Sequence, residues 1–294
     1  MSKKEILLIG AGNIGVYHLA ALKRRKNINV SIIDVSIHKV RFLNDLMDTP
    51  QKTVEPGTIN TKHFDYVILC LQPENRAEWL DLLSKNDGIS VISEKPVLRG
   101  SQIAAVPYLK QFDYNRTCLK RKISSSISFP SDLLRLEYHL VAREASKEVL
   151  MDLYSHGLSV LMQILYDVGW NLIDARINDV SFNRNDLEVC FGLTNVVNGV
   201  ENIVDINICL DNQAQHDFVI INEKRYAFET PIQSMRKRPV RFMIERFVLS
   251  RRDYIYDYFD EFYSMVFSNG FSQLMDKTIE IDEKIYMELS NELG

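Results

Sequence analysis

Several features that would place this chain in a special class are missing from its 294 residues. Its formal net charge is −4, so it has no overall positive field of the kind that attracts nucleic acid. No apolar run approaches the roughly 18 residues of a membrane-spanning helix. The apolar stretch at residues 6–9 ends at Gly10, which is too early for a signal peptide. We therefore expect a cytoplasmic protein with neither nucleic acid nor a membrane among its partners.

Cysteine is also scarce. The sequence has four cysteines, and none of them stands in a C-x-x-C pair. Cys70 and Cys209 fall in apolar, strand-like runs, which predicts buried free thiols in a reducing compartment. No cluster of histidines or carboxylates supports a metal site, and we predict none.

What the sequence does have is an ordinary globular composition, with 46% hydrophobic and 25% charged residues. At about 150 residues per domain, this length suggests two domains. We place the first at residues 1–118 and the second at 119–294. No internal repeat is visible.

The beginning of the chain carries the most informative motif. A buried-strand pattern at residues 4–9 is followed by Gly10-Ala11-Gly12-Asn13-Ile14-Gly15, a helical run to about residue 25, and a second strand that ends at Asp34. This order is the full context of a dinucleotide-binding turn. The alternative is a glycine turn that binds nothing.

Each residue of the motif has a physical role in that interpretation. Gly10 allows the tight turn, Gly12 lets the backbone approach a pyrophosphate, and Gly15 lets the helix lie close to the strand. Asn13 and Ile14 open the helix, whose N–H groups face the phosphates. Asp34 would accept hydrogen bonds from a ribose 2′-hydroxyl, which favours NAD over NADP.

Strands and helices continue to alternate through the first domain. The spacing predicts helices at 36–47 and 74–85, buried strands at 65–71 and 88–92, and a loop at 48–63. This alternation is typical of βαβ units and predicts a doubly wound parallel sheet, a Rossmann domain.

The pattern changes after residue 115. The basic triplet at 120–122 and the serines that follow predict a connection between domains, and residues 133–141 predict a strand. Residues 147–168 have helical spacing, and residues 175–221 alternate as an open, mostly antiparallel sheet does. The aromatic-rich run 253–267 predicts a helix packed against that sheet. The second domain is therefore expected to be α+β.

Polar and proline residues mark the ends of two parallel strands. Leu71-Gln72-Pro73 closes one, and Glu94-Lys95-Pro96 closes the next. Ligands of open α/β sheets bind at these strand ends, so we predict that Leu71, Gln72, Pro73 and Glu94 contact the cofactor.

Lys95 would lie beside that cofactor, and Asp152 and His156, four residues apart, share one face of a helix. Together they would form a proton-handling set for alcohol oxidation, with a histidine base that titrates near neutrality. Each also has a simpler interpretation, as a surface lysine and a helix-surface pair.

These motifs, in this order and with this spacing, resemble the glucose–fructose oxidoreductase, inositol dehydrogenase and MocA (Gfo/Idh/MocA) family. The glycine turn followed by His18, the Glu94-Lys95-Pro96 motif and Asp152-x-x-x-His156 carry the resemblance, over about the first 170 residues. It implies a Rossmann domain followed by an open-sheet domain. It also implies NAD(P)-dependent hydride transfer at a hydroxyl or keto carbon of a sugar, a polyol or a nucleotide-sugar derivative. The family usually pairs its open sheets, which implies a homodimer or homotetramer.

In the implied mechanism, His156 takes the hydroxyl proton, Lys95 supports the charge on the oxygen, and Asp152 orients the substrate. Gln72 departs from the family pattern at the end of its strand, and Arg76, Tyr154 and Ser159 also stand where other residues are common. Two further hypotheses therefore stay open. One is a non-catalytic NAD(P)-binding sensor, and the other is a reductase of linear tetrapyrroles, similar to biliverdin reductase. The cluster Arg236, Lys237, Arg238 and Arg241 could bind an anionic substrate or form a solvated turn.

Overall fold

The computed structural model of this chain describes residues 3–47, 63–86, 88–98, 103–116, 118–127, 133–142, 146–183, 187–197, 200–214, 216–228, 254–268 and 273–293. These residues form two compact units. The first holds the described residues of Met1–Glu94, Leu98–Pro107 and Met235–Phe271, and the second holds those of Lys95–Val97, Tyr108–Ser234 and Ser272–Gly294. The chain therefore passes between the units more often than two consecutive domains would require.

The first unit is built on a five-stranded sheet in the order β2-β1-β3-β4-β5, and all its strand pairs are parallel. The strands are β1 (Lys4–Ile9), β2 (Ile28–Ile33), β3 (Tyr66–Leu69), β4 (Ser90–Ser93) and β5 (Ile103–Ala105). The predicted doubly wound parallel sheet is confirmed. In β3 all four residues are buried, as expected for a strand covered on both faces.

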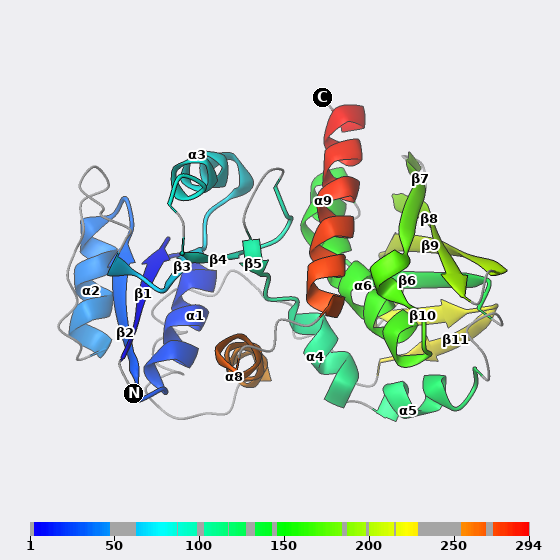
Figure 1. Cartoon of the computed structure of the whole chain (residues 1–294), viewed down its shortest axis with the longest axis horizontal. Coiled ribbons are helices and arrows are strands. Elements are labelled where there is room, and N and C mark those ends of the chain that lie inside the picture. Colours follow the sequence, from blue (N-terminus) through cyan, green and yellow to red (C-terminus); the bar gives the residue numbers. More distant parts are fainter. Residues whose placement is uncertain are drawn as a thin grey trace. The chain divides into compact units, whose positions relative to one another are not determined.

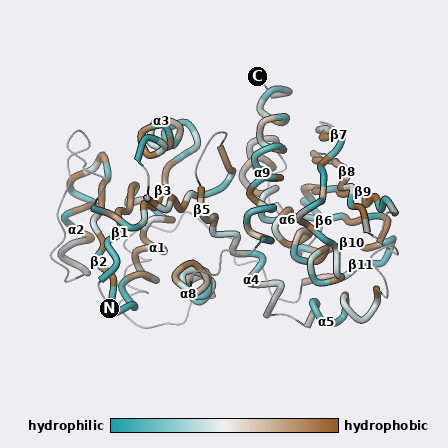
Figure 2. Tube along the Cα trace, in the orientation of Figure 1, coloured by the Kyte–Doolittle hydropathy of each residue, from teal (hydrophilic) through white to brown (hydrophobic). Residues whose placement is uncertain are grey.

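The helices of this unit among the described residues are α1 (Asn13–Lys23), α2 (Ile37–Met47), α3 (Pro73–Leu83) and α8 (Tyr254–Phe267). Figure 1 shows α1 and α8 on one side of the sheet and α3 on the other. The parallel strands between these layers are largely hydrophobic (Figure 2). This layering leaves the carboxyl ends of the strands at one edge.

Helix α8 forms where it was predicted, but its partner was predicted wrongly. It lies against α1 of the first unit, not against the second sheet. The Phe259 ring lies 4.5 Å from the His18 ring and 6.2 Å from that of Tyr17, and Phe267 lies 5.3 Å from Tyr66. Aromatic rings bury large areas against any complementary apolar surface, so the sequence of α8 indicates burial without naming its partner.

The second unit contains a six-stranded sheet in the order β11-β10-β6-β9-β8-β7. Its strands are β6 (Arg135–Val141), β7 (Arg176–Asn183), β8 (Glu188–Val197), β9 (Val200–Asp211), β10 (Phe218–Ile221) and β11 (Lys224–Ala227). All neighbours are antiparallel except β6 and β9, which run parallel. The predicted mostly antiparallel sheet is therefore confirmed.

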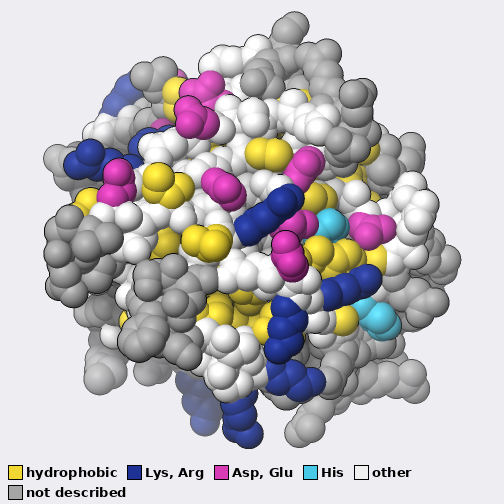
Figure 3. All heavy atoms as spheres, turned by 90° about the vertical axis from the view of Figure 1, so that its right-hand side faces the viewer, with side chains coloured by type: hydrophobic (Ala, Val, Ile, Leu, Met, Phe, Trp, Pro, Cys, Tyr) yellow, Lys and Arg dark blue, Asp and Glu magenta, His cyan; other side chains and the backbone are white. Residues whose placement is uncertain are grey.

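The helices of this unit are α4 (Leu109–Arg116), α5 (Cys118–Ser124), α6 (Lys147–Asp167), the short 3₁₀ helix η4 (Leu172–Asp174) and α9 (Gln273–Leu293). Helices α6 and α9 cover one face of the sheet (Figure 1). Leu136, Tyr138 and Leu140 of β6 are buried on that face, whereas Arg135, Glu137 and His139 alternate onto the other. Figure 3 shows charged and apolar side chains mixed on the side of the protein that carries this sheet.

Other expectations have mixed outcomes. The segment from residue 115, predicted as a connection, forms α5, because its apolar residues Leu119 and Ile123 are four apart and buried in the core of the second unit. Residues 48–62 of the loop predicted at 48–63 lie outside the described residues. Cys70, Cys190 and Cys209 are free thiols, but they are partly rather than fully buried. No described helix has the length and apolarity to span a membrane.

Candidate active site

The glycine turn connects β1 to α1, and each glycine meets a different environment. Gly10 has φ +99°, and a Cβ there would lie 2.5 Å from the Cys70 carbonyl oxygen. A Cβ at Gly15 would lie 2.0 Å from the Gly10 carbonyl oxygen, so these two positions require glycine for turn and packing. At Gly12 a Cβ would meet nothing within 4 Å. The free space in front of Gly12 is what a bound pyrophosphate would need.

The start of α1 is open to an anion. Gly12 is its N-cap residue and makes no side-chain capping bond, and the first turn contains no acidic residue. The first N–H groups of a helix carry a partial positive charge, so this end favours a phosphate. Asn13 is exposed and Ile14 is partly buried at this end of the helix.

Asp34 ends β2 and holds the turn in place. Its Oδ2 accepts a hydrogen bond from the Ala11 N–H at 2.8 Å, and its Oδ1 accepts one from the Ser36 N–H at 2.8 Å. A carboxylate offers about four lone pairs, so each oxygen can still accept a bond from a ribose hydroxyl. The structure thus gives Asp34 a positioning role that the sequence analysis missed.

The residues after β3 lie at the carboxyl edge of the parallel sheet. Leu71 and Pro73 are partly buried, and Gln72 is exposed. Gln72 is the N-cap residue of α3 and Pro73 is its first residue. Proline fits this position because its fixed φ suits the helix and the N–H it lacks would have no partner there.

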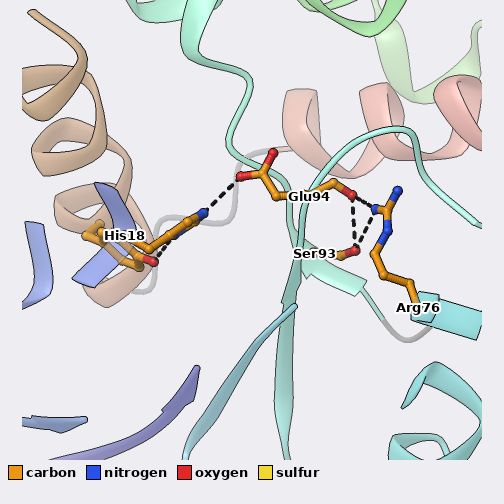
Figure 4. A network of polar contacts seen from close by, with 5 residues as sticks. His18, Arg76, Ser93 and Glu94 are labelled. Carbon is orange, nitrogen blue, oxygen red and sulfur yellow. Dashed lines mark hydrogen bonds and ion pairs between the residues drawn. The ribbon is translucent and has the colours of Figure 1, made fainter. Parts of the chain in front are cut away.

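Glu94, at the end of β4, is bound within the first unit (Figure 4). Its Oε1 lies 2.9 Å from Nε2 of the fully buried His18, whose Nδ1 contacts the Tyr263 hydroxyl of α8. Its backbone oxygen accepts a hydrogen bond from the buried Arg76 guanidinium, which also donates to the Ser93 hydroxyl at 3.2 Å. Both polar ends of Glu94 are therefore engaged by protein groups, and its contact with a cofactor stays a prediction.

This network explains the departure from the family pattern at Arg76. Arg76 reaches from α3 to the Glu94 backbone oxygen, at the peptide that leads into Lys95 (Figure 4). Burying a guanidinium is costly unless its N–H groups find acceptors, and the Glu94 oxygen supplies one. Arg76 thus fixes the strand end that precedes Lys95.

Lys95 and His156 both belong to the second unit, and the positive charge of Lys95 acts on the His156 ring. Ser146 caps the start of α6 by accepting a hydrogen bond from the Val149 N–H at 3.3 Å, and His156 follows two to three turns later. Burial lowers the pKa of His156 well below its ordinary value, and the positive charges of Lys95 and Lys110 lower it further. The histidine is therefore neutral at pH 7, and the predicted titration near neutrality is corrected to a lower pH.

His156 also has a free ring nitrogen. Its Nδ1 is buried, and none of the described residues hydrogen-bonds to it. A buried polar atom without a partner is costly, which makes it a candidate for contact with a ligand. Lys110, the second cation near His156, pairs with the buried Asp217 at 2.8 Å.

The departures at Tyr154 and Ser159 are structural. Tyr154 is fully buried, and its hydroxyl donates to the Asp282 backbone oxygen at 3.3 Å. The Ser159 hydroxyl donates to the His156 backbone oxygen at 2.9 Å. Both residues make hydrogen bonds to backbone oxygens, and that of Ser159 goes to His156 itself.

Some predicted residues cannot be placed further. Asp152 lies on α6, but its side chain is outside the part of the chain that the structure describes, and so is the cluster at 236–241. Among the described residues, no group of three histidine, cysteine or carboxylate side chains could hold a metal ion.

Solved structures share this fold over nearly the whole chain. A myo-inositol dehydrogenase from Corynebacterium glutamicum is 15% identical, with a TM-score of 0.56 over 98% of this chain and 95% of that one. An oxidoreductase from Agrobacterium radiobacter in complex with NAD⁺, L-tartaric acid and magnesium is 13% identical, with a TM-score of 0.55 over 99% and 97%. A Gfo/Idh/MocA family oxidoreductase from Vibrio cholerae is 10% identical, with a TM-score of 0.52 over 99% of each chain.

The sequence itself matches no protein-family profile and no curated protein. The chain therefore has the two-part fold of these oxidoreductases, as the sequence motifs led us to expect. At 10–15% identity this likeness establishes architecture, and the activity has to be argued from the site.

Proposed function

We propose that this protein is an NAD-dependent dehydrogenase or reductase that acts on the CH–OH group of a sugar, a polyol or a related small molecule. The observation that carries the proposal is His156, a neutral histidine in the field of Lys95 whose buried Nδ1 has no hydrogen-bond partner among the described residues. A base that is neutral at pH 7 beside a cation is the pair that alcohol oxidation requires. The dehydrogenases that share this fold support the choice of reaction.

The first unit fits a dinucleotide. The turn at Gly10, Gly12 and Gly15 leaves room in front of Gly12, and the uncapped start of α1 suits phosphates. Asp34 has remaining acceptor capacity for a ribose hydroxyl and would repel a 2′-phosphate, which supports NAD rather than NADP. When bound, the nicotinamide would accept or supply the hydride.

The residues of the second unit handle the proton. His156 takes the proton of the substrate hydroxyl, or returns it in the reverse direction. Lys95 donates a hydrogen bond to the same oxygen and stabilises negative charge that develops on it. Asp152, four residues before His156 on α6, would orient the substrate through a neighbouring hydroxyl.

The test begins with cofactor binding and continues with substrates. NADH and NADPH are titrated against the protein by fluorescence, and a panel of inositols, sugars, sugar acids and hydroxy acids is then offered with NAD⁺. We expect absorbance at 340 nm to rise with at least one compound, and the His156→Gln variant to lose that activity while still binding NADH.

The result also decides between the alternatives. Tight NADH binding without turnover of any compound would favour the sensor hypothesis. NAD⁺-dependent oxidation of a reduced linear tetrapyrrole, which is the reductase reaction in reverse, would favour the reductase hypothesis. A homodimer or homotetramer in the cytoplasm completes the proposal, and size-exclusion chromatography with light scattering tests the oligomeric state.

A further inference from the structure

The segment that leads into α4 is fixed beside the turn of α6 that carries His156. The Tyr108 hydroxyl donates to the carboxylate of Asp282 at 2.8 Å, and the Ser155 hydroxyl donates to the same carboxylate at 2.9 Å. Ser155 directly precedes His156. Two hydrogen bonds through one buried side chain therefore connect the start of α4 to the His156 turn.

A second contact fixes α4 further along the same helix. The Gln111 amide donates to the Gln163 amide oxygen at 2.7 Å. Gln163 follows His156 by about two turns, so the two side chains lie on the same side of α6. Lys110 stands between Tyr108 and Gln111 in the chain, so its backbone lies between these two contacts with α6.

The ammonium of Lys110 is held close to the same turn by a buried carboxylate. It donates to Asp217 Oδ2 at 2.8 Å, and the Tyr138 hydroxyl donates to that oxygen at 3.2 Å. The Tyr138 ring lies against Gly157, where a Cβ would be 3.1 Å from ring atom Cδ1. Gly157 directly follows His156, so a single tyrosine side chain separates this carboxylate from the His156 turn. The lowering of the His156 pKa by the charge of Lys110 agrees with this position.

Lys110 keeps hydrogen-bond donors for a ligand. An ammonium has three N–H groups, and among the described residues Asp217 is its one hydrogen-bond partner. The Lys110 side chain is 23% exposed, so a ligand can reach it. Asp217 offsets the positive charge, which leaves donors without a net charge. Such donors suit an uncharged hydroxyl oxygen, because no net charge remains to attract a carboxylate.

We propose that Lys110 determines specificity by donating a hydrogen bond to a second hydroxyl of the substrate, one that His156 does not deprotonate. The substrate is then a sugar or polyol, rather than a simple alcohol or a hydroxy acid. This inference rests on the proposed function for what the site binds. Its geometry rests on the contacts of Tyr108, Gln111 and Asp217.

The test variant has to remain folded. Removing the ammonium alone would leave Asp217 buried without its cation, which destabilises a protein. The test variant therefore combines Lys110→Met with Asp217→Asn. The matched control combines Lys120→Met with Asp167→Asn, because Lys120 and Asp167 form a second such pair at 3.0 Å, and Asp167 lies about three turns after His156 on α6. Thermal unfolding establishes that both variants are folded.

Binding is measured without turnover, on NADH-loaded protein labelled with ¹³C-histidine. The NMR signal of His156 is assigned by its loss in His156→Gln. Myo-inositol, D-glucose and D-sorbitol are titrated first. Deoxy derivatives that each lack one hydroxyl are then titrated for every compound that shifts the signal.

In the wild type, loss of one particular hydroxyl should weaken binding by about fivefold or more, because one hydrogen bond is lost. The Lys110→Met/Asp217→Asn variant should bind the parent compound more weakly by a similar factor and should not distinguish it from that deoxy derivative. The Lys120→Met/Asp167→Asn control should distinguish the two compounds as the wild type does.

Three results would overturn the inference. The first is a Lys110→Met/Asp217→Asn variant that distinguishes all deoxy derivatives as the wild type does. The second is tighter binding of D-gluconate than of D-sorbitol by the wild type, with the preference lost in that variant, because Lys110 would then bind a carboxylate. The third is no shift of the His156 signal with any sugar or polyol, which would refute this substrate class.

The two hypotheses can fail separately. Binding that depends on Lys110, in a protein that oxidises none of the compounds, keeps the role of Lys110 and refutes the proposed dehydrogenase. Turnover of a sugar or polyol with wild-type KM in the Lys110→Met/Asp217→Asn variant keeps the dehydrogenase and refutes the role of Lys110. If both hypotheses hold, KM should rise by about fivefold or more in that variant, whereas kcat changes less, because Lys110 does not contact the reacting carbon.

Discussion

Substitutions at Gly12 and Gly15 test two different roles of the glycine turn. Gly12 is expected to matter for cofactor binding, and Gly15 for the packing of α1. At Gly12 the backbone is extended, with φ −76° and ψ −169°, and an added side chain points into open space. Because any residue can adopt this conformation, Gly12→Val introduces no backbone strain. We expect Gly12→Val to fold with a melting temperature lowered by no more than about 4 °C, because an apolar residue in place of glycine at an N-cap costs about 1 kcal/mol.

At Gly15 the outcome should be the reverse. A Cβ there lies 2.0 Å from the Gly10 carbonyl oxygen, so α1 must move by at least 1.0 Å to reach the 3.0 Å limit of real Cβ contacts. Overpacking of this kind costs about 3 kcal/mol, and the better helix propensity of alanine returns about 1 kcal/mol. The net loss of about 2 kcal/mol corresponds to a melting temperature lower by about 4–8 °C for Gly15→Ala.

The assay pairs thermal unfolding with NADH titration for both variants. Gly12→Val should bind NADH at least tenfold more weakly, a loss of about 1.4 kcal/mol or more, because its side chain fills the space of the pyrophosphate. A folded Gly12→Val with wild-type affinity for NADH would refute the dinucleotide-binding turn. An unchanged melting temperature in Gly15→Ala would refute the packing argument.

Four further predictions follow from the same structure. NADH should bind more tightly than NADPH in fluorescence titrations, and Asp34→Ser should narrow that difference, because the carboxylate that repels a 2′-phosphate is gone. Lys95→Ala and His156→Ala should each bind NADH within about threefold of the wild type and lose roughly 10²-fold or more in turnover, and the double variant should lose much less than the product. The base is neutral His156, and burial lowers its pKa, so kcat/KM for oxidation should stay level as pH falls through about 6.5 and decline only in more acidic buffer. A pH profile of kcat/KM with its midpoint at or above about 6.5 would contradict the burial argument. Tyr263→Phe should cost about 1–3 kcal/mol in denaturant unfolding, because the buried His18 loses a hydrogen-bond partner; full stability would show that this bond contributes nothing.

The architecture was predictable where local pattern determines it. The continuous apolar run of β3 and the alternation along β6 follow from how each strand is covered, and both were visible in the sequence. The glycine turn was equally readable, because its motif is local: Gly15 packs against the Gly10 carbonyl oxygen of the same turn.

The rest depends on long-range contacts that periodicity does not encode. The aromatic face of α8 indicated burial, but not that Tyr263 would meet His18, 245 residues earlier. The burial of Asp282 was missed because no helix was predicted over residues 273–293. The buried Ile281, Ile285 and Leu289 mark an apolar stripe there. An acid on that stripe was the available signal, since charged residues are almost never buried without a partner.

The contact between α8 and α1 has a consequence for how the protein is made. A ribosome finishes α1, β1 and β3 long before it reaches residues 254–267, with the sheet of the second unit synthesised in between. Until then the side chains of Tyr17 and His18 that Phe259 covers stay open to water, and Glu94 lacks the Tyr263 end of its network. Before α8 is made, the nascent first unit thus exposes an apolar surface that α8 covers in the finished protein, the kind of surface that chaperones bind. Its assembly ends only with the last part of the chain, so a premature stop after residue 228 would leave both units without a covering helix.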